Sequence, residues 1–154
     1  MPIGSRLLFS GGVITAGASL LHVAIIIGGP DWYRFFGAGE RMAQRASRGS
    51  LSAAAITASI AIALGIWAFY AFSALGMIRT LPFLGTGLAL ISAVYFGRGI
   101  LGIPLVLLVD EPYLNELKTK MTFMAVTSAI CIYLGVCYAA GALLVWKATA
   151  ASRA

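Results

Sequence analysis

The amino-acid sequence predicts an all-α membrane protein: an antiparallel bundle of four transmembrane helices that forms a single transmembrane domain over residues 1–154. The chain is 60% hydrophobic and only 10% charged, which excludes a soluble globular domain, a disordered segment and a disulfide-rich secreted scaffold. The apolar residues gather in four runs, each longer than the ~20 residues that cross a hydrocarbon core as a helix. These runs cover residues 7–29, 51–78, 81–109 and 121–146.

The first run is expected to remain in the protein as a helix and not to be cleaved as a secretory signal. Arg6 supplies a positive flank, and the small residues that end at Ala18 imitate a cleavage site. However, the apolar stretch continues to Ile27, and cleavage after Ala18 would leave a stub too short to cross the membrane.

The loop between the first two runs interleaves arginines with aromatic side chains. That mixture suits the lipid headgroup layer, because aromatic rings reside at that depth and arginines reach lipid phosphates. We therefore expect part of Trp32–Ala46 to form a short helix on the membrane surface. A solvated loop is an equal alternative, because no clear amphipathic pattern distinguishes the two.

The other two connections are short. Thr80 is the predicted N-cap of the third helix, with Pro82 in its first turn, so the second and third helices should form an antiparallel hairpin. In the loop over residues 110–120, Asn115 is a candidate cap for the last helix.

Charge distribution gives a weak orientation signal and places the protein at a membrane. All five acids lie on the loops that follow the first and third helices, and the net charge of +6 is expected to meet lipid headgroups, not nucleic acid. We expect an integral protein of a bacterial inner (plasma) membrane, with both orientations open. The Lys and Arg count favours a cytoplasmic position for the loops that follow the first and third helices. The basic residues on that side are Arg34, Arg41, Arg45, Arg48, Lys118 and Lys120, and those on the other side are Arg6, Arg79, Lys147 and Arg153.

Arg98 is the only charged residue inside one of the four runs. It lies ~16 Å along the helix from the end of its span, near the middle of the membrane. An arginine at this depth costs about 2.5–3.5 kcal/mol, so it should face a carboxylate, a bound anion or a polar pocket. Gly97, Gly99 and Gly102 beside it allow a neighbouring backbone or a ligand to come close.

His22 lies at a similar depth, about 12 Å along its helix from the same interface. We therefore predict a ligand site formed by Arg98, His22 and Tyr95. The alternative is that Arg98 pairs with a loop carboxylate and only stabilises the bundle, and that His22 only bonds a neighbouring helix. The candidate charge partners are Asp31, Glu40, Asp110 and Glu111.

These features predict a protein that binds or moves a small amphiphilic or anionic ligand, such as a lipid or a quinone-like molecule, with the first loop as a lid. A non-catalytic accessory or assembly subunit is the main alternative, and a membrane enzyme that acts on lipid is the third. Enzyme activity stays open and is the less expected case. We expect no metal and no cofactor, because a single histidine and scattered acids and cysteines assemble neither a zinc nor a haem site. Membrane lipid is the expected partner, and assembly into a homo-oligomer or a larger membrane complex stays open.

Overall fold

The computed structural model describes residues 2–152 and contains, in that range, seven helices and no strand. Four helices are long and apolar enough to cross a membrane, which confirms an all-helical integral membrane protein. They are α1 (Ile3–Gly28), α4 (Leu51–Ala74), α5 (Leu84–Leu108) and α7 (Met121–Ala151). The short helices are α2 (Pro30–Phe35) and α3 (Glu40–Ser47) in the first loop, and α6 (Pro112–Lys118) in the third.

The connection between α4 and α5 differs from the prediction. α4 ends four residues earlier than expected, where Gly76 adopts a positive φ of 71° that glycine favours. Thr80 and Pro82 both precede α5, and the N-cap position is Phe83, so the predicted cap was wrong. Ser73 holds the loop instead, because its hydroxyl accepts from the Leu81 N–H at 2.9 Å and donates to the Arg79 carbonyl at 3.1 Å.

The third loop also differs from the prediction. Asn115 lies inside α6, where its side chain donates to Asp110 at 2.6 Å, so it does not cap α7. Lys120 occupies the N-cap position of that helix, without a side-chain cap. α6 itself was not expected, because a seven-residue helix that begins at a proline leaves little periodic signal.

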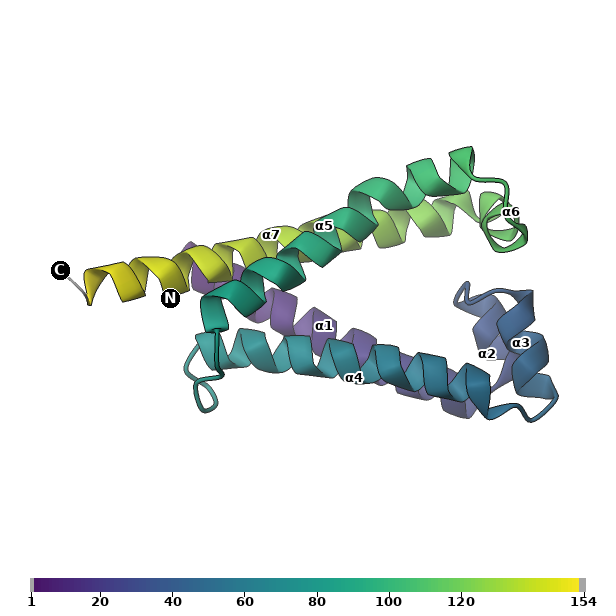
Figure 1. Ribbon diagram of the computed structural model, residues 1–154, viewed down its shortest axis with the longest axis horizontal. Coiled ribbons are helices and arrows are strands. Elements are labelled where there is room, and N and C mark those ends of the chain that lie inside the picture. Colours follow the sequence, from purple (N-terminus) through teal and green to yellow (C-terminus); the bar gives the residue numbers. More distant parts are fainter. Residues whose placement is uncertain (1, 153–154) are drawn as a thin grey trace.

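The four long helices alternate in direction and associate as two pairs, α1 with α4 and α5 with α7 (Figure 1). The pairs meet at the end that holds both termini and diverge toward α2, α3 and α6. Consequently α4 and α5, which are consecutive in sequence, do not pack along their whole length.

Glycines and buried hydroxyls hold the two pairs together at the closed end. A Cβ added at Gly11 of α1 would lie 2.6 Å from the Cys137 Cβ of α7, so only glycine allows this approach. Deeper in the molecule, Thr15 Oγ1 of α1 lies 3.0 Å from the Tyr95 hydroxyl of α5. Tyr138 of α7 donates to the Trp67 carbonyl of α4 at 3.0 Å. This end is therefore a packed junction to which all four long helices contribute.

Candidate functional site

A cavity of about 880 Å³ lies where the two helix pairs diverge. Its volume is within the range of about 300–1,000 Å³ that is typical of small-molecule sites. The walls are mainly apolar side chains from α1, α4 and α7, and α2, α3 and α6 contribute at the loop end. The lining residues with polar side chains are His22, Tyr33, Arg41, Arg45, Thr57, Arg98, Tyr113 and Thr127.

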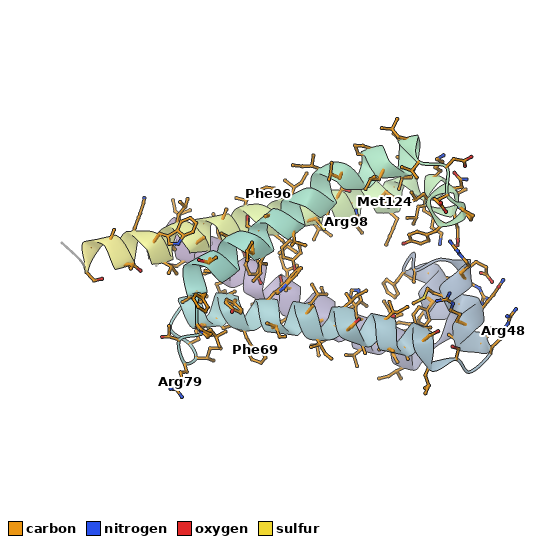
Figure 2. The ribbon with its side chains drawn as sticks, viewed as in Figure 1. Arg48, Phe69, Arg79, Phe96, Arg98 and Met124 are labelled. Atoms are coloured by element: carbon orange, nitrogen blue, oxygen red, sulfur yellow. The ribbon has the colours of Figure 1, made fainter. Side chains whose placement is uncertain are left out.

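Arg98, labelled with Met124 in Figure 2, lines this cavity from α5. The residue is exposed, and within residues 2–152 its guanidinium has no hydrogen-bond partner and no carboxylate within 4.0 Å. It lies over Gly102, one turn along α5 toward α6, where an added Cβ would collide with Nη1. The sequence therefore provides room for the side chain to bend toward the loop end, but no partner for its charge.

Two buried hydroxyls near this space lack a hydrogen-bond partner. Ser128 on α7 is only 3% exposed, and a Cβ added at Gly102 would lie 3.3 Å from its Oγ, on the same side as the Arg98 guanidinium. Tyr33 on α2, which lines the cavity, is 1% exposed and its hydroxyl is also unpaired. Because an unpaired buried hydroxyl typically costs about 1–3 kcal/mol, both are unusual in a native structure.

His22 lines the same cavity from α1. Its Nδ1 lies 2.7 Å from the Ala18 carbonyl oxygen, and because a carbonyl only accepts, Nδ1 carries the proton. In the neutral ring, Nε2 is then an acceptor that does not take part in this bond. His22 and Arg98 thus face one space from opposite helix pairs.

The other residues predicted at the site lie elsewhere. Tyr95 does not line the cavity, because its ring packs between Trp67 and Tyr138 and its hydroxyl meets Thr15. None of the four candidate acids contacts Arg98. Asp31 and Glu40 bind Arg34, Asp110 accepts from Asn115, and Glu111 occupies the N-cap position of α6 without an ion pair in the described part of the chain.

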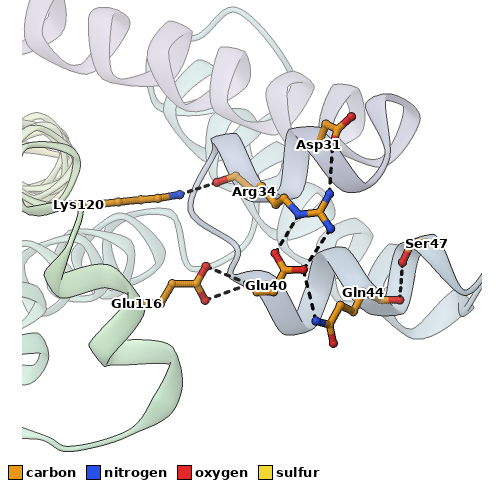
Figure 3. Close-up of polar contacts among 7 residues, drawn as sticks. All are labelled: Asp31, Arg34, Glu40, Gln44, Ser47, Glu116 and Lys120. Carbon is orange, nitrogen blue, oxygen red and sulfur yellow. Dashed lines mark hydrogen bonds and ion pairs between the residues drawn. The ribbon is translucent and has the colours of Figure 1, made fainter.

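Three hydrogen-bonded contacts, which we call the rim, join α6 and the start of α7 to the α2–α3 segment at the loop end of the cavity. Figure 3 shows two of them, those made by Glu116 and Lys120. Positive φ angles at Gly37 (75°) and Gly39 (90°) turn that segment toward α6. In the rim, Lys120 Nζ donates to the Arg34 carbonyl at 2.7 Å, the Glu40 N–H donates to the two Glu116 carboxylate oxygens at 3.0 and 3.1 Å, and the Tyr113 hydroxyl donates to the Gly37 carbonyl at 3.1 Å.

Beside the rim, the side chains of Arg34 and Glu40 form an ion pair. The hydrogen bond from Arg34 lowers the pKa of Glu40, and the same bond raises the pKa of Arg34. Burial raises the pKa of the Tyr113 phenol, and the positive charge of Arg98 opposes that rise. The positive charge of Arg98 therefore acts on Tyr113, which lies at the loop end of the cavity.

Arg41 and Arg45 line the cavity and were not predicted at the site. They lie one turn apart on α3, both exposed, and neither side chain has a hydrogen bond or an ion pair within residues 2–152. No aspartate or glutamate lines the cavity in the described part of the chain. The i, i+4 spacing of two arginines in the first loop was the available signal, but it does not show which way they face.

The residues that the structure describes include no group of three or more His, Cys, Asp or Glu side chains that could hold a metal ion. Comparison with known proteins gives no match to a family model, to a curated protein or to a solved structure. The fold and the cavity define the class, a small polytopic membrane protein with an apolar cavity that contains arginines and is bounded by its membrane-spanning helices.

Proposed function

We propose that this protein binds an amphiphile with an anionic head group in the cavity. The head lies at Arg98, with His22 opposite, and the hydrocarbon chain lies among the apolar walls. The observation that carries the proposal is an arginine in a membrane span that faces a cavity and has no carboxylate partner in residues 2–152.

The energetic argument concerns what offsets the cost of Arg98. An arginine near a helix centre costs about 2.5–3.5 kcal/mol, and a purely structural arginine would recover this with a paired carboxylate. Asp31, Glu40, Asp110 and Glu116 bind other groups, and no acid lines the cavity within residues 2–152. A bound anion would supply the missing charge through two parallel N–H···O bonds to the planar guanidinium.

The α2–α3 segment supplies the cover of the site in this proposal. Trp32 and Phe35 on α2 are exposed apolar residues beside the arginines of α3, which is the composition that favours the headgroup layer. We therefore place α2 and α3 at the membrane surface, above a ligand whose chain lies deeper between the helix pairs.

The test is ligand-dependent thermal stabilisation of the purified full chain in a non-ionic detergent. Oleate should raise the Tm of the wild type, and oleyl alcohol, which lacks the charge, should not. At a concentration one hundred times the Kd, binding adds about 2.7 kcal/mol of stability. The Arg98→Gln variant should fold and lose the shift, because the head group loses its main partner.

The matched control is Arg79→Gln, which removes one positive charge from the loop between α4 and α5, outside the cavity. It should keep the full shift with oleate. An equal shift in Arg98→Gln would refute the proposal. If no amphiphile stabilises the wild type and a protein co-purifies in fixed stoichiometry, the accessory-subunit hypothesis replaces it.

A further inference from the structure

Three arginines from opposite sides of the cavity remain without a counter-charge. Arg98 comes from α5 in one helix pair, and Arg41 and Arg45 come from α3, which packs against α4 of the other pair. Arg41 and Arg45 are one turn apart on a helix, so their like charges repel unless an anion lies between them.

No acid forms an ion pair with any of the three arginines within residues 2–152. The Glu40 carboxylate binds Arg34 at 2.8 and 3.1 Å, and the Glu116 carboxylate accepts the Glu40 backbone N–H. Neither acid lines the cavity. Within residues 2–152 the three arginines therefore have no ion-pair partner, and a bound anion would supply the counter-charge.

We infer that the cavity selects an amphiphile whose head group is a phosphate monoester, held jointly by Arg41, Arg45 and Arg98. This inference rests on the proposed function and specifies its ligand class. A carboxylate or a phosphodiester carries one negative charge, whereas a phosphate monoester carries about −1.5 to −2 near pH 7 and presents three acceptor oxygens. Such a head group has enough charge and enough oxygens to meet arginines from both helix pairs.

The experiment compares three single-chain lipids with the same oleoyl chain on the full-length protein in non-ionic detergent at neutral pH. They are lysophosphatidic acid (a monoester), lysophosphatidylglycerol (a diester with one charge) and lysophosphatidylcholine (a zwitterion). The wild type should bind the monoester about tenfold more tightly than the diester, because two further charge-assisted contacts form. The zwitterion should bind more weakly than the diester.

The diagnostic variant is Arg41→Gln/Arg45→Gln. It should reduce the preference for the monoester over the diester to roughly twofold or less, while the diester still binds through Arg98. The matched control, Arg48→Gln/Arg79→Gln, loses the same charge at positions outside the cavity and should keep the full preference. Arg41→Lys/Arg45→Lys retains the charge, serves as a check on folding and should keep part of the preference.

Each outcome bears on one claim. Equal affinity of the wild type for the monoester and the diester would overturn this inference but leave the proposed function intact. An unchanged preference in Arg41→Gln/Arg45→Gln would overturn the assignment to those arginines. If glycerol phosphate alone binds as tightly as the lysolipid, the ligand is a free phosphate ester and the lipid assignment fails. If no anionic lipid binds, the proposed function fails as well.

Discussion

Two glycines that flank Arg98 have opposite surroundings. A Cβ added at Gly99 would lie 2.7 Å from Ile132 Cγ1 and 3.0 Å from both the Ile132 nitrogen and the Ser128 carbonyl oxygen. Two of these three atoms are backbone, so they cannot move aside without separating α5 from α7. A Cβ added at Gly97 would meet nothing within 4 Å.

We predict that Gly99→Ala destabilises the protein by about 1–3 kcal/mol, because overpacking forces the helix backbones apart. Gly97→Ala is the control and should be neutral or slightly stabilising, because alanine favours a helix over glycine. Reversible unfolding in mixed micelles measures both variants. Equal stabilities would show that the close contact at Gly99 does not limit the packing of α5 on α7.

For single residues, the sequence predicted the unusual ones better than the ordinary ones. Arg98 and His22 were identifiable because polar groups are rare inside apolar spans, and both line one cavity; ligand binding there stays a prediction. Arg41 and Arg45 were not identifiable as lining residues. The direction in which these two side chains point depends on the turn at Gly37 and Gly39, which sets the orientation of α3 relative to α2.

Among the short elements, the α2–α3 segment contains an ion pair between the side chains of Arg34 and Glu40. Arg34 lies 2.8 Å from a Glu40 oxygen, and this bond holds the pKa of Glu40 below its ordinary value of 4.5. A carboxyl with a lowered pKa in the folded state stabilises that state above its ordinary pKa. The contribution is lost as the pH falls below about 4.5, where the unfolded chain takes up a proton more readily than the folded chain.

We predict that Glu40→Gln lowers the Tm at neutral pH and that the difference from the wild type shrinks as the pH falls through the acidic range. Both partners are about half exposed, so the effect is small. A pH series of thermal unfolding curves in non-ionic detergent provides the measurement. A difference that stays constant down to pH 3 would mean that the Arg34–Glu40 pair does not contribute.

The long helices could be predicted because length and hydropathy suffice for a membrane span. The predicted helix ends were less accurate, by as many as five residues in α7, which continues to Ala151 through polar residues that do not break a helix. α6 was missed, and the first loop contains two helices, α2 and α3, where the sequence left one short helix and a solvated loop as equal alternatives. The position of α2 and α3 at the membrane surface stays a prediction.

For the whole molecule, the contacts at the packed junction hold the two helix pairs together. Thr15 on α1 is completely buried, and its Oγ1 lies 3.0 Å from the Tyr95 hydroxyl on α5. This is a side-chain hydrogen bond from one helix pair to the other, next to a cluster of aromatic rings. Tyr95 therefore has a structural partner in the junction, away from the cavity lining.

We predict a coupling energy of about 1 kcal/mol between Thr15→Val and Tyr95→Phe in a double-mutant cycle, within the range measured for hydrogen bonds between membrane helices. Tyr95→Phe should also leave the affinity for anionic amphiphiles unchanged. A loss of that affinity without a loss of stability would show that Tyr95 belongs to the ligand site, as the sequence predicted.

The pairing of the helices could not be predicted. In lipid, the face that meets another helix is as apolar as the face that meets acyl chains, so periodicity does not reveal the contact. Ser59 of α4 illustrates the problem, because a small polar side chain in a membrane span favours an interface between helices. It is exposed, and its hydroxyl donates to the Ile56 carbonyl one turn earlier.

The divergence of the two helix pairs also has a consequence for the membrane itself. A molecule that is narrow at the terminal end and broad at the α2–α3 end occupies more area in one leaflet than in the other (Figure 1). A bilayer that contains many such molecules is expected to bend, with the leaflet that holds the broader end on the convex side. We therefore expect the shape that creates the cavity to favour curved membrane.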